Sequence, residues 1–119
     1  MDLPVVNHQD YEAQLNDDNK FPIKKFGELA KHLVLHKVVK TFHKPEPCSI
    51  ETLKEAHSLE YINKIKNKSL DKNEVRKIGL PLVDSVVRRS FIATGGTVMA
   101  TKLALNYGIA CNTAGGSHH

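Results

Sequence analysis

The sequence predicts an α/β fold with a parallel sheet. Two short apolar segments, residues 3–6 and 109–112, have the length and residue types of strands and lie near the two ends of the chain. Amphipathic helical patterns separate them, and the longest, residues 84–107, comes directly before the second strand. Strand, helix and strand in alternation indicate a parallel sheet, because parallel strands need a crossover connection.

The first strand is followed by a polar loop at residues 8–10, which continues through residues 16–19. A helix is predicted from Lys24 onward, because apolar side chains recur at the i, i+3, i+4 and i+7 positions of one helix face. These side chains are Phe26, Leu29, Ala30 and Leu33. A second β-like segment at residues 38–42 is expected to end near Pro45, since proline cannot donate to a sheet ladder.

Side chains that favour helix starts recur in the middle of the chain. Ser49 and Ser58 are predicted N-caps of two short helical pieces. Asp71 with Glu74 three residues later is a capping-box pattern, and we expect this helix to end around Gly79.

The long helix at residues 84–107 is predicted to stop at Gly108 and to pack against the sheet through its broad apolar surface. Gly95 and Gly96 inside it each cost about 1 kcal/mol relative to alanine. Close approach by neighbouring backbone is the expected compensation.

Composition narrows the class of protein. Hydrophobic residues make up 40% of the 119 residues and charged residues 25%, which predicts one globular domain or part of one. The net charge is +4, but the lysines lack interleaved aromatic residues, so no specific nucleic-acid partner is expected. No apolar run is long enough for a membrane span, and the start lacks signal-peptide features, so the predicted location is cytoplasmic. Cys48 and Cys111 form no Cys-x-x-Cys pair and are expected to be reduced, semi-buried thiols.

The candidate catalytic residues follow the last strand. Ligands in open α/β sheets bind beyond the carboxyl ends of the strands, and there the chain carries Gly115, Gly116, His118 and His119. Glycine lets backbone approach a ligand, and neutral histidine can accept and return a proton near neutral pH. Taken alone, however, Gly-Gly-Ser-His-His resembles a linker followed by a clipped affinity tag, and these five residues by themselves favour the tag.

The other basic side chains are expected to be structural or solvated. His8 is predicted to be a solvated loop residue, and His57 to cap a helix or to bond within the core. Arg88 and Arg89 are assigned to solvent, since adjacent residues point to different sides of a helix. His32, His36 and His43 are expected at the surface.

Seven motifs change the interpretation of the histidine pair. They are His8-Gln9-Asp10-Tyr11, Phe21-Pro22-Ile23-Lys24-Lys25-Phe26, His57-Ser58-Leu59-Glu60-Tyr61-Ile62, Arg76-Lys77-Ile78-Gly79-Leu80-Pro81, Val87-Arg88-Arg89-Ser90, Gly95-Gly96-Thr97 and Asn112-Thr113-Ala114-Gly115-Gly116-Ser117-His118-His119. In this order they resemble the N-terminal region of the histone deacetylase family, especially bacterial members similar to the class IV branch. The resemblance covers nearly the whole chain and argues against a tag.

The resemblance implies the three-layer arginase/deacetylase fold, in which residues 1–119 would be the N-terminal portion of a partial deacetylase domain. It implies hydrolysis of the acetyl amide of lysine or a similar small amine, with zinc polarising the carbonyl and activating water. By the match to Gly-Gly-x-His-His, His118 would position the zinc-bound water. His119 would act as general base and then as general acid. Gly115 and Gly116 would border the substrate.

The family's zinc ligands, an Asp, the His of an Asp-x-His motif and a second Asp, lie beyond the histidine pair. No metal ligand is therefore expected in this chain, and the fragment alone is expected to bind no zinc. The leading hypothesis is a truncated or split member that is inactive alone, with a complementing C-terminal polypeptide as its expected partner. The alternative is a non-enzymatic remnant or binding module that associates through an exposed sheet edge.

Overall fold

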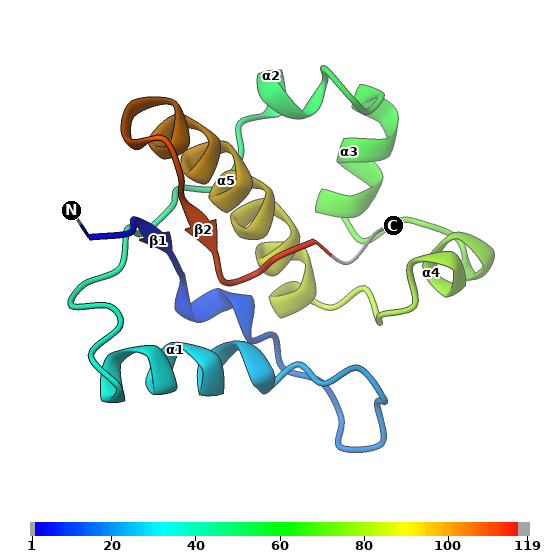
Figure 1. Cartoon of the computed structure of the whole chain (residues 1–119). Coiled ribbons are helices and arrows are strands. Elements are labelled where there is room, and N and C mark those ends of the chain that lie inside the picture. The colour runs from blue at the N-terminus through cyan, green and yellow to red at the C-terminus, as the bar shows by residue number, and fades with distance from the viewer. Residues whose placement is uncertain (1, 117–119) are drawn as a thin grey trace.

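A computed structural model describes residues 2–116, and helices dominate it, with a small parallel sheet (Figure 1). In chain order the elements are β1 (Val5–Val6), the 3-10 helix η1 (Gln9–Tyr11), α1 (Lys25–Leu35), α2 (Ile50–Leu53), α3 (Leu59–Lys66), α4 (Lys72–Ile78), α5 (Asp84–Tyr107) and β2 (Cys111–Asn112). The predicted mixed architecture with parallel strands is confirmed at this level.

The two strands pair in parallel through the first and last elements of the chain. Val5 is in register with Cys111, and Val6 with Asn112. On the other side of β1, the backbone of His43 forms an isolated parallel bridge with Val6. β1 is therefore the central line of pairing, with β2 on one side and residue 43 on the other.

The β-like segment predicted at residues 38–42 is not a strand. The backbone N–H groups of Val38 and Val39 both donate to the carbonyl oxygen of Leu33, at 2.9 and 3.2 Å, and so close the end of α1. Lys37 has a positive φ of 58°, which turns the chain out of the helix. Because the N–H groups of Val38 and Val39 bond to the end of the helix, they are not available to β1. Pairing with β1 therefore begins only at His43.

The core lies where α1 and α5 pack against η1. η1 lies between the two helices (Figure 1), and α5 also packs along both strands. Tyr11 and Val6 are fully buried. The core cluster contains Tyr11, Ala13, Ile23, Phe26, Val86, Ile92 and Ala114. The predicted packing of the long helix against the sheet is confirmed.

Gly95 and Gly96 lie where backbone and side chains cross α5 closely. A Cβ on Gly95 would overlap the carbonyl oxygen of Glu46, and the N–H of Cys48 donates to the carbonyl of Phe91 at 2.9 Å. A Cβ on Gly96 would overlap the hydroxyl of Tyr11. The close backbone approach predicted at the glycine pair is therefore confirmed at Gly95, whereas side chains rather than backbone approach Gly96.

The predicted helix caps are also confirmed. The side chains of Ser49 and Ser58 each accept a hydrogen bond from the backbone N–H three residues later. Asp71 and Glu74 form a complete capping box, and Gly79 ends α4 in the left-handed region with φ 83°. α5 begins and ends as predicted, with Gly108 after its last residue.

The two cysteines differ from the predicted semi-buried thiols: Cys48 is buried and Cys111 is exposed. Several large apolar side chains are also exposed, including Leu105 at 82% and Leu35 at 72%. Within residues 2–116, no helix has the length and apolar character needed to cross a membrane.

Candidate active-site edge of the sheet

The carboxyl ends of β1 and β2 lie side by side and are joined by hydrogen bonds. The N–H of Thr113 donates to the carbonyl of Val6 at 3.0 Å, and its hydroxyl donates to Oδ1 of Asn7 at 2.7 Å. The N–H of Gly115 donates to the carbonyl of Asn112 at 3.0 Å, and Gly115 has φ +59°. The chain therefore leaves β2 in a tight turn that is anchored to the end of β1.

The side chain of Asn112 joins this turn to η1. Its Oδ1 accepts hydrogen bonds from the hydroxyl of Tyr11 at 2.8 Å and from the N–H of Ala114 at 3.3 Å. Because a backbone N–H can only donate, Ala114 requires the oxygen, rather than the nitrogen, on this side of the amide. The Nδ2 atom is buried and finds no hydrogen-bond partner within residues 2–116.

Tyr11 is a neutral donor in this arrangement. Burial raises the pKa of Tyr11 to about 12, and the hydrogen bond to Asn112 and the charge of Arg89 offset only part of that rise. The phenol therefore keeps its proton through the physiological range and donates to Asn112.

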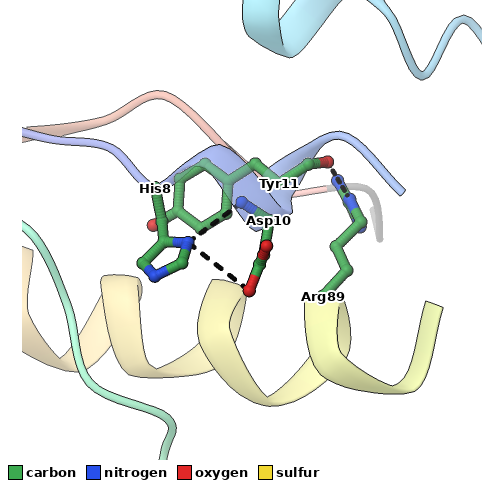
Figure 2. A network of polar contacts seen from close by, with 4 residues as sticks. All are labelled: His8, Asp10, Tyr11 and Arg89. Carbon is green, nitrogen blue, oxygen red and sulfur yellow. Dashed lines mark hydrogen bonds and ion pairs between the residues drawn. The ribbon is translucent and has the colours of Figure 1, made fainter. Parts of the chain in front are cut away.

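Arg89 holds Tyr11 from the side of α5. Its Nε donates to the carbonyl oxygen of Tyr11 at 2.7 Å (Figure 2), and its guanidinium lies 4.6 Å from the centroid of the Phe26 ring. Burial lowers the pKa of Arg89. The prediction that both arginines are simply solvated is wrong for Arg89, which faces η1, whereas Arg88 is exposed.

His8 is not a solvated loop residue, contrary to prediction. Its side chain is 11% exposed, and its Nδ1 accepts a hydrogen bond from the N–H of Asp10 at 2.9 Å (Figure 2). The imidazole takes the place of an N-cap side chain for η1, an element that the loop interpretation missed.

The role predicted for His57 is also wrong. His57 is exposed, and its ring lies 5.5 Å from the ring of Tyr61, while Ser58 caps α3. Together with apolar side chains of α3 and α5 it lines a cavity of about 210 Å³. His32, His36 and His43 are exposed, as predicted.

The predicted site residues are only partly described. Gly115 and Gly116 lie exposed at the turn after β2, where they border a cleft beside the C-terminal half of α5. His118 and His119 lie outside the described residues. Among residues 2–116, no three His, Cys, Asp or Glu side chains come together in a way that could hold a metal ion.

Tyr11, Asn112 and Arg89 were not predicted as parts of this site. Tyr11 and Asn112 stand in two of the seven motifs, but their spacing of 101 residues gives no local signal that they meet. Gly96 signalled a close approach without identifying the partner. Only the folded chain brings these groups together.

Ligands of open α/β sheets bind beyond the carboxyl ends of parallel strands, and here β1 and β2 end together before a glycine turn. The sequence matches the Histone deacetylase domain family over residues 20–119. The chain belongs to this family. Over its whole length it is 36% identical to an uncharacterized protein of Picosynechococcus sp., and it spans 40% of that protein's length.

Proposed function

We propose that this chain carries the histidine-pair side of a zinc-dependent amide hydrolase, whose substrate is the acetyl amide of lysine or of a similar small amine. Family membership supports the reaction class. The observation that carries the proposal is the turn after β2, which Asn112 and Thr113 fix at the carboxyl edge of the strands. The chain leaves this turn directly into Ser117, His118 and His119.

In this proposal the two histidines divide the proton chemistry. His119 accepts a proton from the attacking water and returns it to the amine that leaves, as a neutral imidazole can near pH 7. His118 hydrogen-bonds the same water and orients it. Gly115 and Gly116 offer backbone without side chains beside the substrate.

The described residues, 2–116, do not supply a zinc site by themselves. A catalytic zinc takes about three protein ligands and keeps one position open. Since the chain spans 40% of its relative, we propose that those ligands lie in sequence beyond these 119 residues. By the same reasoning we expect the 119 residues alone to be inactive and free of tightly bound zinc.

The test measures zinc content and hydrolysis of an acetyl-lysine peptide and of an acetylated polyamine. The samples are the 119-residue chain alone and the chain combined with the polypeptide encoded immediately downstream. We expect zinc uptake and turnover in the combined sample, abolished by His119→Ala and retained in His57→Ala, which changes an exposed histidine. Absence of zinc and turnover from both samples would overturn the proposal.

A second candidate is a binding module that pairs through the outer edge of β2, which bonds to no further strand within residues 2–116. The N–H groups of Cys111 and Thr113 point to β1, and alternation along a strand therefore places the N–H of Asn112 on the outer edge. Concentration-dependent association in sedimentation, without turnover in any sample, would favour this candidate.

A further inference from the structure

We infer that Tyr11 and Asn112 are positioning residues, which set the course of the turn that presents the histidine pair. The inference rests on the proposed function for its catalytic consequence. Its structural part rests on contacts among residues 2–116.

Asn112 holds the turn with both its side chain and its backbone. Oδ1 accepts from the N–H of Ala114, and the backbone carbonyl accepts from the N–H of Gly115. Two consecutive residues of the turn therefore depend on the last residue of β2. A rotation of the Asn112 side chain would release the first of these bonds and change the direction in which the chain leaves the strand.

Tyr11 fixes the rotation of that side chain. Its hydroxyl donates to the same Oδ1, and the ring itself is fully buried. Arg89 holds the backbone of Tyr11 from α5, and the imidazole of His8 caps the helix that carries it. Gly96 leaves the space in which the hydroxyl and the amide meet. The turn is thus tied to η1 and α5, as well as to its own strand.

The buried Nδ2 of Asn112 argues for orientation over stability. A buried donor without a partner is costly, and replacing a buried polar pair by apolar groups of similar shape can be nearly neutral. Within residues 2–116 Nδ2 has no partner, whereas Oδ1 of the same amide accepts two hydrogen bonds. Their common effect is to join Ala114 to Tyr11.

The experiment follows backbone amide exchange and the imidazole signals of His118 and His119 by NMR in the full 119-residue chain. Asn112→Ala is expected to speed exchange at Ala114 by about 3- to 10-fold, the range that corresponds to one hydrogen bond. Tyr11→Phe should have a smaller effect in the same direction, and both variants should shift the two imidazole signals. Tyr61→Phe, a tyrosine of α3 remote from β2, is the matched control and should leave these signals in place.

A second readout separates positioning from folding. In the combined, active sample, Tyr11→Phe should lower kcat by about 10-fold or more with KM little changed, because a misdirected base slows the chemical step. Unchanged exchange at Ala114 and unchanged imidazole signals in both variants would overturn the inference. If no sample is active but these signals move as expected, the proposed function fails while the structural part of the inference stands.

Discussion

Tyr11 is the residue whose chemistry the fold changes most. Its pKa rises from an ordinary 10.0 to about 12, chiefly because burial disfavours the phenolate. Well below pH 12 this phenol therefore keeps its proton and remains a hydrogen-bond donor at the carboxyl edge of the strands.

This shift predicts a specific loss of stability in alkali. The folded-state pKa lies above the unfolded value, so the contribution is fully present below pH 10 and is lost as the pH rises toward 12. We expect the free energy of unfolding to fall across that interval, and to fall less in Tyr11→Phe. Urea unfolding at a series of pH values measures both slopes, and equal slopes would contradict the assignment.

The residues that sequence reasoning placed well are those whose partners are close in the chain. Ser49, Ser58 and Asp71 bond to N–H groups three residues away, so spacing alone predicts them. Arg89 bonds to Tyr11, 78 residues earlier, and spacing says nothing about such a pair. His8 escaped prediction for another reason, because imidazole is not among the usual N-cap side chains.

At the scale of elements, the crossing of α5 by residues 46–48 depends on one glycine. In Gly95→Ala the new Cβ would overlap the carbonyl of Glu46, which is backbone and cannot turn away. We expect a loss of about 1–3 kcal/mol in the free energy of unfolding, as for overpacked cores. Denaturant unfolding gives the value.

Gly27→Ala is the matched control in α1. There the new Cβ would meet the Oε1 atom of Glu12, the end of a flexible side chain that can move. Helix propensity then favours alanine, with a gain of up to about 1 kcal/mol. Equal effects of the two substitutions would show that the crossing at Gly95 is not tight.

The capping box gives α4 a stability that depends on pH. The backbone N–H of Glu74 donates to Asp71 and holds the pKa of that carboxyl below its ordinary value. Because the folded pKa is depressed, the contribution is present above the ordinary pKa of 3.8 and is lost as the pH falls below it.

Asp71→Ala should therefore speed amide exchange in α4 near neutral pH and remove its acid sensitivity, with α5 unaffected. Asp17→Ala, in the polar loop at residues 16–19, is the control and should change neither. Slow exchange retained throughout α4 in Asp71→Ala would mean that tertiary packing, rather than the cap, holds the helix.

The order and type of the two strands and of helices α1 to α5 were predictable because each has a local signal: β-branched runs, amphipathic spacing, caps and glycine stops. The 3-10 helix η1 was missed, because its N-cap is the imidazole of His8. The strand at residues 38–42 was mispredicted because Val38 and Val39 suit a strand by residue type, yet they donate to Leu33 and end α1 instead. For the candidate site, the sequence predicts a location at the carboxyl edge of the strands but not the contacts within it. The contacts that shape it join residues about a hundred positions apart.

Viewed as a whole, the molecule is more open than a compact domain of its length. Its radius of gyration is 15.1 Å, against about 13.5 Å expected for 119 residues. Large apolar side chains are exposed on its outer elements, with Leu105 of α5 at 82%, Val38 at 61% and Ile109 at 59%. If the proposed function is right, we expect further sequence of the domain to cover these side chains.

Leu105 and Ile92 lie on the same helix, but substitutions at the two positions should have very different effects on stability. Ile92 is 6% exposed and belongs to the core, so Ile92→Ala should cost about 2–5 kcal/mol of stability in the 119-residue chain. Leu105→Lys should leave that stability within about 0.5 kcal/mol and should reduce binding of a hydrophobic dye. In the combined sample with the downstream polypeptide, Leu105→Lys should instead weaken the association, which titration calorimetry would measure. An association unaffected by this lysine would mean that the C-terminal half of α5 stays open to solvent in the completed protein, and that the partner packs elsewhere.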